Sequence, residues 1–202
     1  ISCMVKKIII FILVYIFIYN DSFGNVNRNK VIKYLENFQS LNSNFIQVNN
    51  NGDILTGIFY ISRPGKFRIE YDQVPILLIG DSRKLAVINK DLKSISFQSL
   101  KEMPVGVLLF QKISMKDIKI LNLQKENNML TVDIIDSKFK DQGMVEILFE
   151  TKPFIMKKWT IIKNNQTKTE VFFDNLFFDK NLSPKLFDIE SEDPRKIPWK
   201  NN

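Results

Sequence analysis

The most constraining feature of the sequence is a succession of short apolar–polar alternations, separated by turn-forming residues, that runs from residue 44 to 178. In its clearest segment Phe67, Ile69 and Tyr71 alternate with charged residues that we expect to face water. Asn, Gly and Asp gather between the segments, as in 49–53, where they favour hairpin turns. The pattern therefore limits this part of the chain to an antiparallel meander.

The alternations predict one large antiparallel sheet of about ten strands, which places the chain in the mainly β class. One more short strand is predicted over 186–189, inside a Pro-containing tail of residues 181–202. The predicted strands of the main pattern cover residues 44–48, 55–62, 67–71, 75–79, 84–89, 94–100, 118–123, 129–136, 144–150, 155–163 and 169–178.

A helix is predicted before the first strand. Leu35 and Phe38 continue a helical spacing of apolar residues in this region. We expect Asn27 or Asn29 to cap the helix, because Asn is a favoured N-cap residue. Residues 40–44 are rich in Ser and Asn, and we expect them to end it.

The apolar run that begins at Met103-Pro104 does not alternate, and it predicts a short helix over 104–111 because Pro is favoured at the first helical position. A sheet of ten strands must curl, and two short helices cannot cover its apolar face with a dense core. This geometry suits a cavity for an apolar ligand. A closed barrel filled by its own side chains is an equal alternative at this point.

The composition removes most catalytic chemistry. The chain has no His and a single Cys, Cys3. Without His, a Ser-His-Asp triad, a Cys-His pair, an HExxH zinc site and a His-ligated haem are excluded. We therefore expect no catalytic residue, no metal site and no cofactor. A hydrolase that uses Asp and Glu carboxylates is a remote alternative.

The N-terminal segment has the pattern of a secretory signal. A Lys pair precedes an uncharged run over residues 8–19, and a small-x-small pattern ends at Gly24. We expect cleavage after Gly24, so that 1–24 is a signal peptide and 25–202 is a single exported domain. The run is short for a membrane span, and an uncleaved anchor is the alternative. Export argues against nucleic acid as the partner of a chain whose net charge is +7.

Five short segments together match the pattern of one known family. The most telling is 57–71, which reads Gly, a strand, Arg-Pro, then Phe-Arg and an aromatic residue. The other four are Phe45-Ile46-Gln47, 79–85 with its displaced Gly, Met103-Pro104 followed by Val107-Leu108-Leu109, and 182–187. On these segments the chain, over residues 28–190, resembles the LolA family of periplasmic lipoprotein carriers.

The resemblance implies an incompletely closed antiparallel β-barrel with an N-terminal helix and a short helical lid. It also implies a periplasmic, monomeric carrier that shields the acyl chains of lipoproteins. Such a carrier takes its cargo from an inner-membrane ABC transporter and passes it to an outer-membrane receptor or to the outer membrane itself. A carrier of free lipid or glycolipid on the same fold is the alternative that the sequence leaves open.

The resemblance also suggests roles for individual residues. Arg63 would hydrogen-bond the lid backbone and hold the lid closed, and Phe67 would contact the transporter; a solvated Arg and a core Phe are the alternatives. The predicted lid residues are Pro104, Val107, Leu108 and Leu109. The residues predicted to line the cavity are Phe59, Ile61, Phe67, Ile69, Tyr71, Val132, Ile134, Ile147 and Phe149 on the strands, with Leu35 and Phe38 on the helix.

Overall fold

The computed structural model of the protein describes residues 26–82, 84–100, 118–136 and 143–196. Contacts divide the chain into one unit that ends at Asn37 and a second that begins at Phe38. Within the described residues, no helix is both long and apolar enough to cross a bilayer. Two predicted features lie outside the described residues: the signal peptide, 1–24, and the lid, with Pro104, Val107, Leu108 and Leu109.

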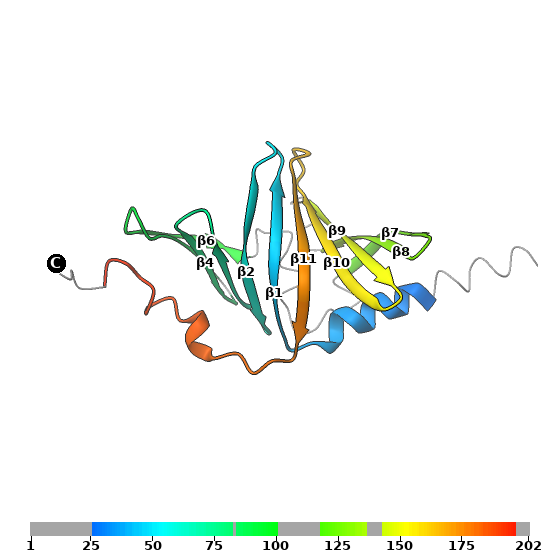
Figure 1. The fold of residues 1–202 in the computed structure, drawn as a ribbon, viewed down its shortest axis with the longest axis horizontal. Helices are drawn as coiled ribbons and strands as arrows, with labels where there is room; N and C mark the ends of the chain where they lie inside the picture. The colour runs from blue at the N-terminus through cyan, green and yellow to red at the C-terminus, as the bar shows by residue number, and fades with distance from the viewer. Residues whose placement is uncertain (1–25, 83, 101–117, 137–142, 197–202) are drawn as a thin grey trace, which may run out of the picture. The chain divides into compact units, whose positions relative to one another are not determined.

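Residues 26–37 are helical (blue in Figure 1). Asn27 and Asn29 both lie within these helical residues, so the prediction that either one caps the helix is wrong. The expectation that residues 40–44 end the helix is wrong too, because strand β1, Ser40–Asn49, includes all of them. They pair with neighbouring strands on both sides, and this pairing overrides the turn preference of Ser and Asn.

Eleven strands form a single antiparallel sheet, which confirms the predicted mainly β fold. The predicted strands of the main pattern all have counterparts, because an alternation of period two marks a strand with one buried face. The strands are β1 Ser40–Asn49, β2 Ile54–Ser62, β3 Lys66–Tyr71, β4 Ile76–Asp81, β5 Lys84–Asn89, β6 Ser94–Ser99, β7 Ile118–Glu126, β8 Met129–Asp136, β9 Met144–Thr151, β10 Phe154–Ile162 and β11 Lys168–Phe178.

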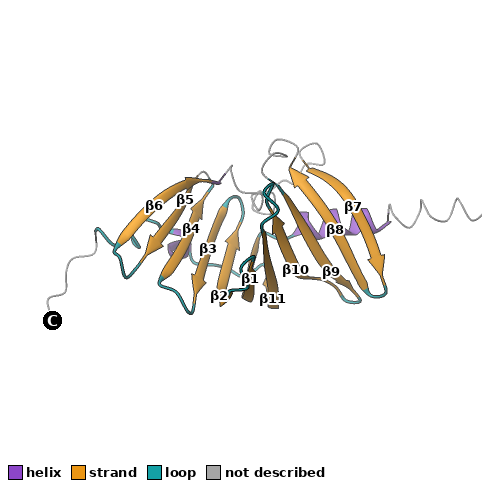
Figure 2. Ribbon diagram, turned by 90° about the horizontal axis from the view of Figure 1, so that it is seen from above, coloured by secondary structure: helices purple, strands orange, loops and turns teal. Residues whose placement is uncertain are grey.

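The strand order is β6-β5-β4-β3-β2-β1-β11-β10-β9-β8-β7, which can be followed across Figure 2. Strands β1 to β6 form one meander and β7 to β11 form a second, and the pairing of β1 with β11 joins the two. Within the described part of the chain β6 and β7 are the two edges and do not pair with each other. The sheet is therefore not closed, as expected for an incompletely closed barrel.

The segment after β11 does not form the short strand predicted at 186–189. Residues Pro184–Phe187 form a 3-10 helix, η3, and the Asp188 amide donates a hydrogen bond to the Lys185 carbonyl at 3.2 Å. Pro184 favours a helical start because its missing N–H has no partner to lose at that position. The helix contacts β3 and β4, and Figure 1 shows the segment, orange to red, running back toward β4.

We call the side of the sheet that this tail covers the outer face, and the opposite side the cavity face. The register of β3 with β4 places Phe67 and Ile69 on the cavity face and Arg68 on the outer face. Apolar residues from three strands bury one another beneath the tail. They are Leu77, Ile79, Ala86 and Ile88, with Ile95 of β6 and Ile189 of the tail packed against them.

Arg68 is buried on the outer face, with 6% of its surface exposed, so the expectation that it faces water is wrong. Its guanidinium donates to the Leu186 carbonyl at 3.1 Å and forms ion pairs with Glu70 and with Glu192, the latter at 2.9 Å. Burial alone would lower the pKa of Arg68, but the hydrogen bonds and charges of the two carboxylates raise it. One Arg side chain therefore fastens the tail to β3.

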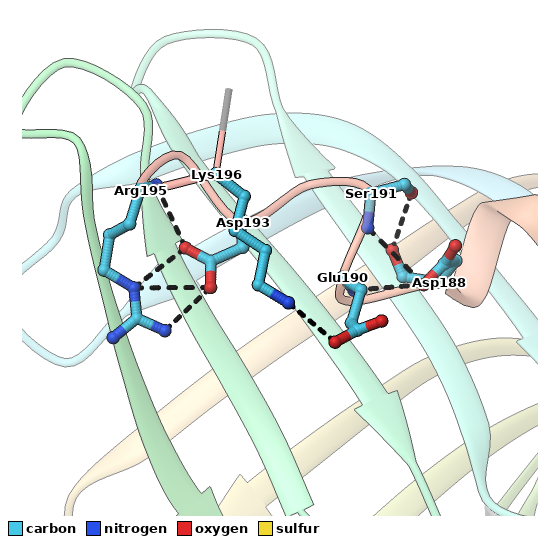
Figure 3. A network of polar contacts seen from close by, with 6 residues as sticks. All are labelled: Asp188, Glu190, Ser191, Asp193, Arg195 and Lys196. Carbon is cyan, nitrogen blue, oxygen red and sulfur yellow. Dashed lines mark hydrogen bonds and ion pairs between the residues drawn. The ribbon is translucent and has the colours of Figure 1, made fainter. Parts of the chain in front are cut away.

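Farther along the tail, local polar contacts fix its turns (Figure 3). Asp193 accepts hydrogen bonds from the Arg195 amide at 3.0 Å and from the Arg195 guanidinium at 2.7 Å. Lys196 pairs with Glu190 at 2.6 Å, and Asp188 accepts a hydrogen bond from the Glu190 amide at 3.0 Å. The hydrogen bonds from Arg195 lower the pKa of Asp193 to about 2.

Candidate functional site

A cavity of about 600 Å³ opens on the cavity face of the sheet. Its volume falls within the usual range for sites that bind small molecules, about 300–1,000 Å³. Its walls come from both meanders, on each side of the β1–β11 pair. The described lining residues are Phe45, Gln47, Phe59, Ile61, Phe67, Ile69, Tyr71, Leu78, Phe97, Gln98, Ser99, Trp159, Ile161, Lys163, Thr169 and Val171.

An aromatic cluster forms the floor of the cavity. Phe59 lies at its centre, with its ring centroid 5.3 Å from that of Phe173, 5.7 Å from Trp159 and 6.4 Å from Phe45. Phe45 in turn meets Tyr71 edge-on at 5.5 Å. Tilted and edge-on pairs of this kind stabilise a structure beyond the area that they bury. The floor is therefore an ordered apolar surface that five strands hold in place.

Gly80 makes room for one wall of the cavity. It is the cross-strand partner of Phe67, and a Cβ at position 80 would clash with the Phe67 ring. With no side chain at Gly80, the ring lies across β4, where it is buried and lines the cavity. The glycine therefore sets the position of this wall.

The cavity changes from apolar to polar along its strands. Ile61 lies at the apolar end. Toward the polar end, the strand registers place first Gln47 of β1, then Thr169 of β11 and finally Lys163, which follows β10. Near the polar end the Tyr71 hydroxyl donates a hydrogen bond to Gln47 Oε1 at 3.0 Å. Burial raises the pKa of Tyr71. Such a gradient suits a ligand with an apolar body and a polar end.

The structure places the predicted lining residues in two groups. Those on β2 and β3 line the cavity: Phe59, Ile61, Phe67, Ile69 and Tyr71. Those on β8 and β9 lie outside its described lining and are only 0–1% exposed: Val132, Ile134, Ile147 and Phe149.

The register explains this second group. Val132 pairs with Ile147, Ile147 with Trp159, and Trp159 with Val171. Cross-strand partners share a face, so these residues lie on the cavity face although the cavity does not reach them. Strand parity identifies the face correctly, but it does not say how far along that face a cavity extends.

Arg63 is buried, with 7% of its surface exposed, so it is not a solvated residue at a strand end. Its guanidinium carbon lies 3.7 Å from the Phe38 ring centroid, and Nη1 donates to the Phe38 carbonyl at 3.4 Å. Burial lowers the pKa of Arg63 to about 10. The lid that Arg63 is predicted to hold lies outside the described residues, so the latch role stays a prediction.

Two residues, Leu35 and Phe38, were predicted to line the cavity from the helix. Phe38 follows the helix, and its ring packs on Arg63 and on Phe178, whose centroid is 5.7 Å away. Leu35 is a buried residue of the helical unit. Neither belongs to the described lining of the cavity.

Sequence reasoning gave no cavity role to eleven of the described lining residues, and four of these matter most for the chemistry of the cavity. Gln47, Trp159, Lys163 and Thr169 belong to β1 and to the β10–β11 hairpin. The signal that could have found them is strand parity, because Trp159, Ile161 and Lys163 alternate onto one face. Trp159 Nε1 is buried and has no hydrogen-bond partner among the described residues. An indole in the wall of a cavity also provides a natural fluorescent reporter.

Comparison with known proteins identifies the family of this chain. The model of the outer membrane lipoprotein carrier protein LolA matches residues 36–190, which is most of the chain. The chain belongs to the LolA family. A relative of this LolA-family chain, an uncharacterized protein of Rickettsia prowazekii (strain Madrid E), is 25% identical over 175 residues. The match covers 81% of this chain and 80% of that protein.

Solved structures share the fold of this LolA-family chain. A DUF1329 family protein from Desulfovibrio piger has a TM-score of 0.53 at 9% identity, covering 79% of this chain and 94% of that one. A proposed outer membrane lipoprotein-sorting protein domain from Vibrio parahaemolyticus has a TM-score of 0.50 at 9% identity, covering 83% and 97%. At these identities the likeness concerns the fold alone.

The site of this LolA-family protein is suited to binding. The LolA family consists of carriers that bind lipids and lipoproteins, and it is not a family of enzymes. In the described part of the chain, no group of three or more Cys, Asp or Glu side chains could hold a metal ion. What the cavity offers is an ordered aromatic surface with a polar end, and such a surface binds apolar groups by removing them from water.

Proposed function

We propose that this protein is a periplasmic carrier that shields the acyl chains of lipoproteins in its cavity. The observation that carries the proposal is the aromatic floor of a cavity on an open sheet, in a chain that belongs to a family of lipoprotein carriers. Acyl chains need a large apolar surface, and the floor around Phe59 and Trp159 provides one. Transport of this kind requires binding and release but no bond-breaking chemistry.

The size of the cavity supports reversible binding. A water molecule occupies about 30 Å³ in the liquid, and a methylene group is of similar size. The cavity of about 600 Å³ therefore holds roughly 20 such groups, which is close to one long acyl chain. Burial at about 0.8 kcal/mol per methylene contributes roughly 16 kcal/mol. Association costs of about 4–15 kcal/mol offset much of this gain, so a bound chain can still be released.

The same proposal includes the route of the cargo. The carrier receives lipoprotein from an inner-membrane ABC transporter and delivers it to an outer-membrane receptor or to the outer membrane itself. Arg63 would hold the lid closed over the empty cavity, since its buried guanidinium offers several donors in a fixed plane. Phe67 would contact the transporter.

A second candidate function is carriage of a free lipid or glycolipid. The cavity volume favours it, because room for about one long chain is less than a triacylated lipoprotein presents. In that case the protein would bind single-chain or partly inserted lipids without a transporter. Identification of lipid extracted from the purified protein by mass spectrometry distinguishes this candidate from the first.

The test of lipoprotein carriage is release from membrane vesicles. Vesicles that contain the ABC transporter and an acylated lipoprotein are incubated with ATP and the full chain. We expect lipoprotein to appear in the soluble fraction as a one-to-one complex with the carrier. Lipoprotein that stays in the membrane while the folded carrier remains unloaded would contradict the proposal.

A pair of variants separates the cavity from the surface. Ile69→Glu introduces a carboxylate into the cavity lining, and Ile54→Glu introduces the same group at a position that is 61% exposed and outside the described lining. A charge buried among apolar groups is strongly unfavourable, whereas an exposed charge is tolerated. We expect Ile69→Glu to abolish release of lipoprotein and Ile54→Glu to retain it.

A further inference from the structure

The polar end of the cavity contains a positive charge. Among the described lining residues, Lys163 is the one that carries a charge, and it follows directly after β10. Thr169 is a cross-strand neighbour of Lys163. It pairs with Ile161, which precedes Lys163 by two residues and lies on the same face of the sheet. Side chains at such diagonal positions lie within reach of a common ligand. An ammonium and a hydroxyl therefore stand together where the apolar floor ends.

Both groups are available to a ligand. Within the described residues Lys163 forms no ion pair, whereas Lys158 on the preceding part of β10 pairs with Glu170. The Thr169 hydroxyl likewise makes no hydrogen bond to another described residue. By contrast, Arg63, beyond the apolar end of the cavity, already contacts the carbonyl and the ring of Phe38. A ligand with an anionic end would therefore be attracted to the Lys163 end.

We propose that the cavity takes an acyl amphiphile whose headgroup carries a carboxylate or a phosphate, and that Lys163 and Thr169 bind this headgroup. The inference rests on the proposed function, since it assumes that the apolar floor takes the acyl chain. It adds the orientation of the bound ligand and a preference for a negatively charged headgroup. The chain lies toward Ile61 and Phe67, and the headgroup stays at the open, polar end, where the ammonium keeps its contact with water.

The orientation fixes which part of the chain lies near each wall. A strand rises about 3.3–3.4 Å per residue, so Trp159 lies roughly 13 Å along β10 from Lys163. With the headgroup at Lys163, the middle of a long acyl chain passes the indole, and its terminal methyl approaches Phe67. Gln47 pairs with Val171, and Val171 pairs with Trp159, so the Gln47 amide lies level with the indole, beside the middle of the chain.

The test compares two ligands that share one acyl chain. Palmitoyl lysophosphatidate is anionic, and 1-palmitoylglycerol is neutral; each is titrated against the full chain below its micellar concentration. We expect the anionic ligand to bind about fivefold more tightly, the ratio that corresponds to one partly exposed ion pair. Palmitate, which tests a carboxylate headgroup, should likewise bind more tightly than 1-palmitoylglycerol. Inorganic phosphate alone should not displace any of these ligands.

Matched variants locate the preference. Lys163→Met should remove it by weakening the anionic ligand about fivefold while the neutral ligand is unchanged. Lys163→Arg should retain it, and Thr169→Val should reduce it. Lys168→Met is the control, because it removes one positive charge from the same hairpin at an exposed residue outside the described lining.

The outcomes distinguish the inference from the function on which it rests. If neither amphiphile binds, acyl-chain carriage itself fails, and the inference fails with it. If both bind equally, or if Lys168→Met has the same effect as Lys163→Met, the headgroup site is refuted while acyl-chain carriage stands. Displacement of bound lysophosphatidate by inorganic phosphate would also refute it, because the site would then recognise a free anion.

Discussion

The contact between Arg68 and the tail gives the sharpest stability prediction. In Arg68→Met the aliphatic stem is kept and the guanidinium is lost. The charge-assisted bond to the Leu186 carbonyl is worth about 1.5–3 kcal/mol. Glu70 and Glu192 are partly exposed, so each ion pair adds only about 0.5 kcal/mol. We expect the free energy of unfolding to fall by about 2.5–4 kcal/mol.

Urea unfolding followed by circular dichroism measures this loss, and thermal unfolding gives an independent value. In a domain of this size each kcal/mol shifts Tm by about 2–4 °C, so Tm should fall by about 5–16 °C. The variant should also expose the tail to limited proteolysis, because η3 loses its main polar contact with β3. Phe67 and Ile69 flank Arg68 on the same strand, so the cavity wall should become more mobile as well.

Lys185→Met is the matched control for Arg68→Met. It removes one positive charge from η3 at an exposed residue that forms no ion pair within the described part of the chain. We expect its unfolding free energy to change by less than about 0.5 kcal/mol, as is usual for a surface substitution. If Arg68→Met costs no more than Lys185→Met, the tail is not fastened by the guanidinium and the reasoning is refuted.

Three further predictions concern the cavity, the latch and the tail. Gly80→Ala should push the Phe67 ring into the cavity and weaken acyl-chain binding at least severalfold in ligand titrations, with an unchanged far-ultraviolet spectrum. Arg63→Leu removes a buried cation. The variant should still take up acyl chains but deliver them slowly in an assay of transfer between donor and acceptor vesicles. Normal delivery would contradict the latch role. Arg195 holds the pKa of Asp193 at about 2, so the stability that this pair contributes should be complete above about pH 4 and lost as the pH falls through about 2. Unfolding measured against pH should show that loss, and Asp193→Asn should diminish it.

The sheet could be predicted from the sequence because its strands have one buried face. Alternation such as Phe67, Ile69 and Tyr71 is the direct consequence of that arrangement, and short turns between strands favour a meander. The same logic identified the cavity side of β2 and β3. What alternation cannot give is the pairing partner of a polar segment, which is why residues 40–44, now part of β1, were expected only to end the helix.

The outer face was mispredicted because its cover comes from far along the chain. Arg68 has the pattern of a solvated residue, and only the tail near Leu186 and Glu192 removes it from water. A local pattern contains no information about a contact over more than a hundred residues. The polar end of the cavity was missed for a related reason, since Lys163 and Thr169 become a site only when β10 and β11 align beside β1.

The central claim is that an acyl chain enters the cavity, and Trp159 fluorescence tests it most directly. In the full chain with Trp199→Phe, Trp159 is the remaining Trp and lies in the cavity wall. A lysophospholipid brominated in the middle of its acyl chain is titrated against this variant. The account predicts saturable quenching at one lipid per protein, which Ile69→Glu weakens and Ile54→Glu leaves unchanged. If the brominated lipid quenches the Trp159 emission no more than the unbrominated lipid does, the claim that an acyl chain enters the cavity is contradicted.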